Sequence, residues 1–169
     1  MTDERYPIGQ FECDDVISKE QVAEWIEEIR VLPEQLKEVI KDLSDEELNR
    51  SYRENGWTVR QLVHHIADSH MNSYIRIKLA LTEETPTIKP YEETEWAELP
   101  DYSLPISESL QLIESLYVRW VYLLQSLTEE QLKRAFLHPD SGITTVEKSI
   151  GIYAWHGKHH LAHIQNALK

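Results

Sequence analysis

The feature that most constrains the fold of this chain is a helix-start signal that recurs along it. A Ser or Thr is followed three residues later by Gln or Glu, in the arrangement of a capping box. The pairs are Ser18/Gln21, Ser44/Glu47, Thr58/Gln61, Thr128/Gln131 and Thr144/Glu147. Five such signals in 169 residues predict a mainly helical protein.

Apolar residues at helical spacing indicate where the long helices run. We expect four of them, over residues 19–43, 59–81, 106–127 and from about 145 to near the C-terminus. Pro33 should kink or briefly break the first helix, because proline removes a backbone donor and crowds the preceding turn. A long connection with a short helical piece near 93–99 joins the second helix to the third, and residues 138–142 read as a turn.

Four long helices with one long crossover predict an all-α four-helix bundle. The chain is long enough for one domain with a proper core, and 41% of its residues are hydrophobic. Internal repeats, linkers and low-complexity tracts are absent from the sequence, so we expect residues 1–169 to form a single domain.

Charge and composition limit the partners. The net charge is −13, which argues against nucleic-acid binding because such proteins need a positive surface. No stretch approaches the roughly 18 apolar residues of a membrane span, and the start, Met1 to Arg5, lacks the features of a secretory signal. The lone Cys13 fits a reducing compartment. We therefore expect a cytoplasmic protein that binds neither nucleic acid nor membrane.

The histidines are concentrated in two of the predicted helices, and only His138 lies elsewhere. The second helix carries His64, His65 and His70, and the last carries His156, His159, His160 and His163. At about 100° per residue, His156 and His160 flank the apolar stripe of the last helix on one side. His65 flanks the stripe of the second helix, whereas His64 and His159 should face water.

This placement predicts a divalent metal site formed by His65, His156 and His160, one per chain. An alternative stays open, because histidines on amphipathic helices are usually surface residues or hydrogen-bonded core residues. The chain would then be a helical interaction module with incidental histidines. His70 lies inside the apolar stripe, which favours a hydrogen-bonded core histidine and leaves an alternative ligand as the second interpretation.

Other residues near the predicted site have two interpretations each. Asp68 and Asn72 could orient a ligand or touch substrate, and Arg76 could bind an anionic group, but solvated or ion-paired residues would look the same. Three aromatic residues are candidates for core or pocket wall, with core favoured: Trp57, Trp120 and Tyr153. We assign no residue a catalytic role beyond metal binding.

Two stretches of the chain closely resemble the DinB superfamily and, within it, the YfiT group of metal-dependent hydrolases. They are Trp57 to Tyr74, with the sequence WTVRQLVHHIADSHMNSY, and Tyr153 to Ile164, with the sequence YAWHGKHHLAHI. The likeness extends from Tyr6 nearly to the C-terminus. It implies an up-down-down-up four-helix bundle with a divalent metal at one end of the core. In that family the ligands are the histidine eight residues after a tryptophan and a His-x-x-x-His pair, which here are His65, His156 and His160.

Three neutral imidazoles leave a coordination position open, as in catalytic zinc sites. Zinc is expected and nickel also suits imidazole, so the sequence does not decide between them. The cation could activate a water molecule or a thiol. Gly157 stands where zinc peptidases with this spacing have a glutamate base, which argues against that class. The absence of any Glu-x-x-His sequence argues against a ferritin-like di-iron centre.

Two classes of function follow. The resemblance implies a metal-dependent hydrolase acting on a small molecule, or a metal-dependent transferase of a low-molecular-weight thiol such as bacillithiol. The same three ligands would also suffice for a metal-binding or sensing protein without turnover. The resemblance further makes a homodimer reasonable, and the sequence does not identify the substrate.

Overall fold

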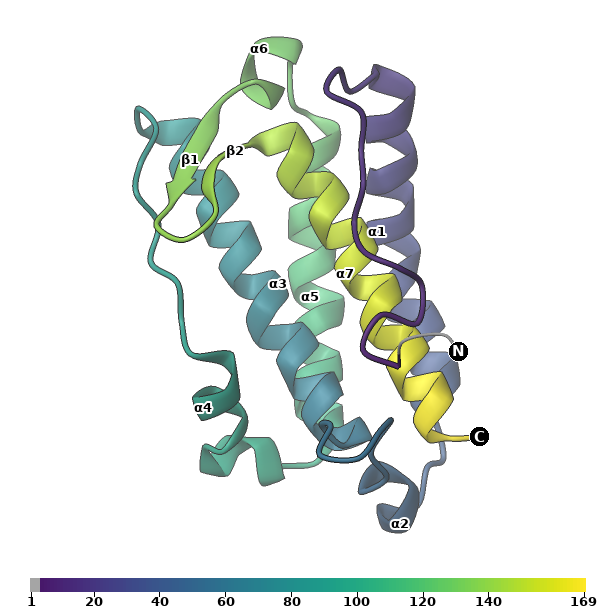
Figure 1. Ribbon diagram of the computed structural model, residues 1–169. Coiled ribbons are helices and arrows are strands. Elements are labelled where there is room, and N and C mark those ends of the chain that lie inside the picture. The colour runs from purple at the N-terminus through teal and green to yellow at the C-terminus, as the bar shows by residue number, and fades with distance from the viewer. Residues whose placement is uncertain (1–3) are drawn as a thin grey trace.

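Four long helices form the body of the molecule in the computed structural model, which describes residues 4–169 (Figure 1). The first three residues of the N-terminal stretch considered above therefore lie outside the described residues. The helices are α1 (Lys19–Ile40), α3 (Val59–Thr82), α5 (Ile106–Gln125) and α7 (Val146–Ala167). In Figure 1, α1 and α7 run downwards while α3 and α5 run upwards. The predicted four-helix bundle with an up-down-down-up order is confirmed.

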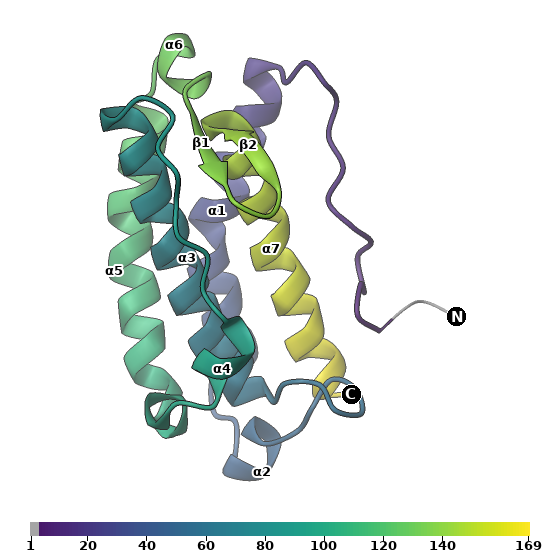
Figure 2. The same cartoon turned by 60° about the vertical axis from the view of Figure 1, so that its left-hand side comes forward.

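The parallel direction of α3 and α5 requires a crossover that returns along the bundle. Residues 83–105 make this connection, passing down the outside of α3 and carrying the short helix α4 (Glu93–Ala97) and the 3₁₀ helix η1 (Pro100–Ser103) (Figure 2). Around the bundle, α1 and α3 each contact both α5 and α7. The crossover thus leaves α3 packed directly against α7, the two helices that carry the histidine clusters.

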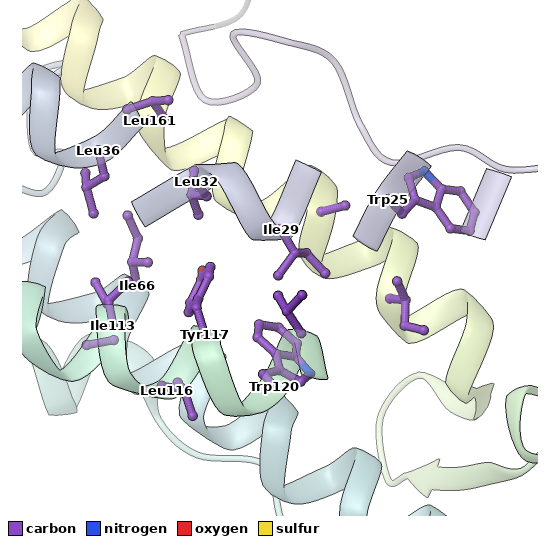
Figure 3. Packing of buried hydrophobic residues seen from close by; sticks show 14 of the residues in the cluster. Trp25, Ile29, Leu32, Leu36, Ile66, Ile113, Leu116, Tyr117, Trp120 and Leu161 are labelled. Carbon is purple, nitrogen blue, oxygen red and sulfur yellow. The ribbon is translucent and has the colours of Figure 1, made fainter. Parts of the chain in front are cut away.

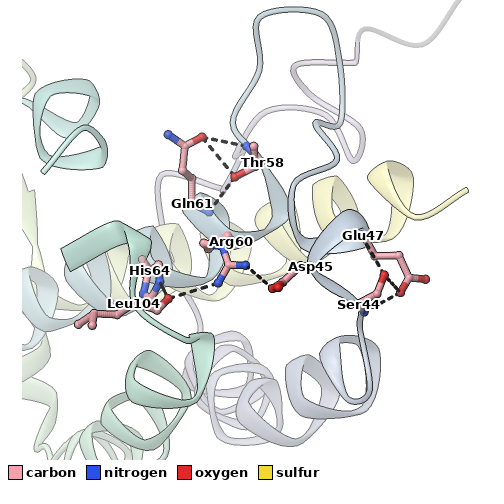
Figure 4. Close-up of polar contacts among 8 residues, drawn as sticks. All are labelled: Ser44, Asp45, Glu47, Thr58, Arg60, Gln61, His64 and Leu104. Atoms are coloured by element: carbon pink, nitrogen blue, oxygen red, sulfur yellow. Dashed lines mark hydrogen bonds and ion pairs between the residues drawn. The ribbon is translucent and has the colours of Figure 1, made fainter. Parts of the chain in front are cut away.

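Four of the five predicted helix-start signals cap helices. Ser18 caps α1, and Thr58 caps α3 through a complete capping box with Gln61 (Figure 4). Ser44 and Thr128 form capping boxes at two short helices, α2 (Asp45–Leu48) and α6 (Glu129–Leu132). The fifth prediction is wrong by one residue: Thr145 caps α7 by accepting from the Lys148 amide.

Thr144 lies one residue before the cap, within a hairpin that the sequence analysis did not predict and whose last residue, Thr145, is the cap itself. Strands β1 (Ala135–His138) and β2 (Gly142–Thr145) pair antiparallel, with Phe136 opposite Thr144. The turn expected over residues 138–142 is the turn of this hairpin, where Gly142 adopts a positive φ of 85°. The hairpin lies over the end of the bundle where α7 begins (Figure 1).

Helix α1 bears on the sequence-based expectations at two places. It continues through Pro33 without the break that was one of the two predicted outcomes. It also ends at Ile40, three residues earlier than expected, because Lys41 is extended and Asp42 adopts a left-handed φ of 60°. A left-handed residue cannot continue a right-handed helix.

The core runs along the bundle axis as one cluster of apolar side chains. Figure 3 shows its middle, where Leu32 and Leu36 of α1 face Ile113 and Tyr117 of α5. These contacts bury apolar area that stabilises the fold by about 25 cal/mol per Å². No helix within residues 4–169 has the length and apolarity needed to cross a bilayer.

Buried polar residues are distributed unevenly among the four helices. Within residues 4–169, all buried polar or charged residues, with tyrosine not counted among them, belong to α3 and α7. They are His64, His65, Ser69, His70, Ser73, Glu147, Ser149, His159, His160 and His163. The contact between α3 and α7 is therefore where polar chemistry is collected.

Candidate metal centre

Three histidines from α3 and α7 meet with their Nε2 atoms facing one another. The Nε2 atoms of His65 and His156 lie 3.3 Å apart, and those of His156 and His160 lie 3.1 Å apart. One ring nitrogen from each of the three lies within 4.8 Å of the others. We call His65, His156 and His160 the histidine trio. The structure thus brings together the three residues that the sequence analysis singled out.

The spacing within the trio fits a single cation. Zinc–imidazole bonds of about 2.0–2.1 Å in a tetrahedral shell place two ligand nitrogens about 3.3 Å apart. The two Nε2–Nε2 distances in the trio, 3.1 and 3.3 Å, agree with this value. Three imidazoles leave at least one position of such a shell open to a small molecule.

Burial keeps the trio neutral, which is the form that binds metal. His65 is only 1% exposed, and this burial lowers its pKa to about 4. Burial also lowers the pKa of His156 and of His160 well below the ordinary value of 6.5. Protons therefore compete weakly for the three lone pairs at neutral pH.

Aromatic rings enclose the trio. The Trp57 ring lies 4.5 Å from the ring of His65 and 6.3 Å from that of His160, measured between centroids. Tyr153 lies 5.5 Å from His156 in the same measure. Trp57 and Tyr153 are only partly buried, so they form the wall of the site, whereas Trp120 is a core residue with 0% exposure.

His70 is a hydrogen-bonded core histidine, the first of its two interpretations. It is fully buried, and its Nε2 lies 2.9 Å from Nδ1 of His156. Its Nδ1 contacts the Tyr117 hydroxyl of α5. His70 therefore contacts the trio from behind, on the nitrogen of His156 that faces away from the other two rings.

A second histidine, His163, makes the corresponding contact to His160. Its Nδ1 lies 3.3 Å from Nδ1 of His160, and its Nε2 lies 3.2 Å from the carbonyl oxygen of Arg5. The ring is stacked on Tyr52, with centroids 3.9 Å apart. His159, His160 and His163 also have ring nitrogens within 4.8 Å of one another, in a second group that shares His160 with the trio.

Two predictions of solvent exposure are wrong, because segments outside the bundle cover the helices. His64 is 4% exposed, and its ring nitrogens contact the Ser109 hydroxyl at 2.6 Å and the Leu104 carbonyl at 3.0 Å (Figure 4). His159 is 7% exposed, stacked on Trp155 and close to Tyr6. Leu104, just before α5, and Ser109, in the first turns of α5, cover His64, and the N-terminal segment covers His159.

The three polar residues considered on α3 have partners other than the trio. Asp68 accepts a hydrogen bond of 2.7 Å from the Tyr102 hydroxyl, and burial raises the pKa of its carboxyl group. The Asn72 amide donates to the Asp68 carbonyl, and the Arg76 guanidinium donates to the Lys89 carbonyl. These contacts position the residues within α3 and against the crossover.

The sequence analysis gave no role to His163 or Tyr117, which contact the residues around the centre. His163 follows His160 by three residues and so lies on the same side of α7, a spacing that could have drawn attention to it. Tyr117 is one of the buried residues of α5. Its contact with His70 depends on the packing of α3 against α5, which no local pattern encodes.

The comparison with known families now defines the class of protein. The profile of the DinB superfamily matches residues 19–164, and this chain belongs to that superfamily. Two relatives, from Oceanobacillus iheyensis and Halalkalibacterium halodurans, are both named "putative metal-dependent hydrolase". The first is 58% identical and aligns over 98% of this chain and 96% of its own length. The second is 57% identical and aligns over 98% of this chain and 97% of its own length.

Solved structures place the chain more narrowly. YfiT from Bacillus subtilis, described as "a probable metal-dependent hydrolase with an unusual four-helix bundle topology", is 50% identical, with a TM-score of 0.94 over 97% of this chain and 95% of that one. These matches confirm the resemblance to the YfiT group. A mycothiol-dependent maleylpyruvate isomerase shares the fold alone, with 18% identity and a TM-score of 0.69 over 85% of this chain and 60% of that one.

Proposed function

We propose that this protein is a metal-dependent hydrolase of small molecules in which the trio holds one divalent cation per chain. The observation that carries the proposal is the convergence of three neutral Nε2 atoms from α3 and α7 at the separations of a shared cation. The names of the relatives support the reaction class. Zinc is our first choice of cation and nickel the second, since both suit imidazole ligands.

A cation bound by three imidazoles supplies Lewis acidity and a water-derived nucleophile near neutral pH. The residues of the chain would position the cation and the substrate. His65, His156 and His160 present their Nε2 atoms from two rigid helices, so that little movement of the backbone is needed. Trp57 and Tyr153 narrow the access to the trio and provide apolar surface against which a substrate can be held.

Hydrolysis is favoured over the other two functions considered. The thiol-dependent protein matched here shares only the fold, so its chemistry carries no weight for this chain. A purely structural metal site is more often closed by four protein ligands. Among residues 4–169, the only group containing His65 and His156 has three members, which leaves room for a reacting molecule.

The first experiment is elemental analysis of the protein purified without chelators. We expect about one equivalent of a divalent metal in wild type and loss of that metal in His65→Ala and His160→Ala. His138→Ala, which removes the histidine in β1, is the matched control and should retain the metal. A wild-type protein that binds no divalent ion, even after zinc or nickel is added, would refute the proposal.

The second experiment separates the reactions. A panel of esters, amides and phosphoesters is incubated with the metal-loaded protein, with and without an added low-molecular-weight thiol. We expect product formation that needs no thiol and that is abolished in His65→Ala. Turnover that appears only when thiol is present would instead establish a thiol transferase, and metal binding without turnover would establish a binding protein.

A further inference from the structure

The contacts behind the trio determine where protons can lie, beginning with His163. Its Nε2 faces the carbonyl oxygen of Arg5 at 3.2 Å, and a carbonyl oxygen only accepts hydrogen bonds. Nε2 of His163 must therefore carry a proton. The His163 ring is only 2% exposed and is stacked on Tyr52, surroundings that favour a neutral imidazole, so its other nitrogen, Nδ1, is an acceptor.

This assignment fixes the tautomer of the next ring. Nδ1 of His160 lies 3.3 Å from Nδ1 of His163, and since the latter accepts, the former must donate. A neutral imidazole has one proton, so Nε2 of His160 is left with a free lone pair. That lone pair points to the trio, where Nε2 of His156 lies 3.1 Å away. A backbone carbonyl in the N-terminal segment thus prepares His160 as a ligand.

The contacts behind His156 allow two arrangements. In the first, the Tyr117 hydroxyl donates to Nδ1 of His70, Nε2 of His70 donates to Nδ1 of His156, and Nε2 of His156 donates to Nε2 of His160. In the second, Nδ1 of His156 donates to Nε2 of His70, and Nδ1 of His70 donates to the Tyr117 oxygen. All these contacts are present in the structure.

Without a cation the first arrangement applies, because the lone pair on Nε2 of His160 faces Nε2 of His156 at 3.1 Å and needs a donor there. Only the second arrangement frees Nε2 of His156 for a cation. His70, His156 and Tyr117 carry three exchangeable protons in either arrangement, one on each side chain, so the change consumes no acid or base. In each of the two rings, His70 and His156, the proton moves from Nε2 to Nδ1. Nothing comparable is available to His160, because the Arg5 carbonyl cannot become a donor.

We infer that the two α7 ligands are controlled by unlike positioning residues: His163 holds His160 in its metal-binding tautomer at all times, whereas His70 and Tyr117 switch His156 into that tautomer when the cation binds. This inference rests on the proposed metal site. It assigns roles to His70, Tyr117 and His163 in positioning the ligands, and none of these three side chains needs to touch the metal or the substrate.

The test is a two-bond ¹H–¹⁵N correlation spectrum of protein with ¹⁵N-labelled histidine, recorded without metal and with one equivalent of zinc. We expect His163 to stay protonated at Nε2 and His160 at Nδ1 in both samples. We expect His70 to change from the Nε2–H to the Nδ1–H form when zinc is added. A His160 ring protonated at Nε2 without metal, or a His70 ring that keeps one tautomer throughout, would overturn the inference.

Variants give a second measurement, the zinc affinity determined by competition with a chelator. His163→Leu removes the acceptor behind His160, and we expect affinity to fall about 10–100-fold. His163→Asn restores an acceptor oxygen near the position of Nδ1 and should recover most of that loss. His70→Leu should weaken binding by a similar factor. Ser73→Ala, a buried α3 hydroxyl with no hydrogen-bond partner, is the control and should leave affinity unchanged.

The outcomes distinguish this inference from the proposed function. Wild type that binds no zinc refutes the proposed function. The tautomers of the metal-free protein then still test whether His163 holds His160 in its Nδ1–H form. Wild type that binds one zinc with the same affinity as His163→Leu and His70→Leu refutes the inference alone. A second zinc that depends on His163 would also refute it, since a cation would then occupy the place of the proton.

Discussion

The helix pair α1 and α5 and the helix pair α3 and α7 contribute to the bundle in different ways. Every buried residue of α1 is hydrophobic. Among the buried residues of α5, only Tyr117 has a hydroxyl group, and none is charged. Helices α3 and α7 together bury ten polar side chains, six of them histidines. One pair therefore supplies mainly hydrophobic stabilisation, while the other combines packing with a site for chemistry.

This division of roles leads us to expect that stability and metal binding are separable in this molecule. Buried imidazoles that lack ideal partners cost free energy, as at Nδ1 of His65, which has no hydrogen-bond partner. The apolar contact between α1 and α5 offsets that cost. Variants on the two pairs should accordingly change different observables.

The largest effect is expected on the apolar pair. Leu36 of α1 is fully buried, and Leu36→Ala should lower the free energy of unfolding by about 2–5 kcal/mol through lost burial and a cavity. The folded fraction should still bind metal as wild type does. Urea denaturation and elemental analysis measure the two quantities. Val118→Ala, at an exposed site on α5, is the control and should change stability by less than about 0.5 kcal/mol. Loss of metal from folded Leu36→Ala would show that the α1–α5 pair also maintains the metal site.

The next effect is a pH dependence that comes from the polar pair. Burial lowers the pKa of His65 to about 4 and that of His70 to about 3, whereas the ordinary value is 6.5. Below pH 6.5 the unfolded chain binds more protons than the folded one, so stability falls with falling pH. We expect the Tm of the metal-free protein to be constant above pH 7 and to drop by several degrees towards pH 4.5. A Tm that stays level over this range would contradict the buried neutral rings.

A smaller effect is expected where the two pairs meet. A Cβ atom added to Gly157 of α7 would lie 2.4 Å from Cδ2 of Leu32 in α1. Gly157→Ala should therefore cost about 1–3 kcal/mol of stability through overpacking. Because Gly157 directly follows His156, zinc affinity should fall as well. The double variant Leu32→Ala with Gly157→Ala relieves the clash, so its affinity should recover, and an affinity that stays low would show that the clash is not the cause.

The smallest effect is expected at the surface beside the centre. Lys158 forms a 2.8 Å ion pair with Glu28, and both side chains are substantially exposed. Such pairs contribute about 0–1 kcal/mol, so Lys158→Ala should change stability only slightly. It should leave zinc affinity unchanged although the residue lies between His156 and His160 in the sequence. A marked loss of affinity would mean that surface charge near α7 contributes to the site.

The sequence predicted the trio because the signals that point to it, helix caps and helical spacing, are local features of the chain. Caps at Ser18, Ser44, Thr58 and Thr128 mark helix starts, and the position of each histidine relative to the apolar stripe follows from helical geometry. Helix angle placed His156 and His160 beside the apolar stripe of α7 and put His159 farthest from it, but it did not by itself exclude His163. The resemblance to the DinB superfamily selected the same residues.

The errors occur where segments outside the bundle take part. His64 and His159 were expected to face water, but each lies beneath a segment without regular amphipathic spacing. The hairpin of β1 and β2 and the Thr144/Thr145 cap were missed for a related reason, since four-residue strands carry too little periodicity to be distinguished from a turn. Partners such as His70 and Tyr117 depend on which helices become neighbours.

The ligands are unequally distributed along the chain, and this has a consequence for folding. His156 and His160 are one helical turn apart, whereas His65 is 91 residues from His156. A nascent or denatured chain already holds the first two as a local chelating pair, but it must close a long loop before the third arrives. If the trio is the metal site as proposed, we expect the metal to bind the denatured ensemble too and to add less stability than the native affinity alone would give. Refolding in excess zinc should then begin from a chain that is already loaded at two of its three ligands.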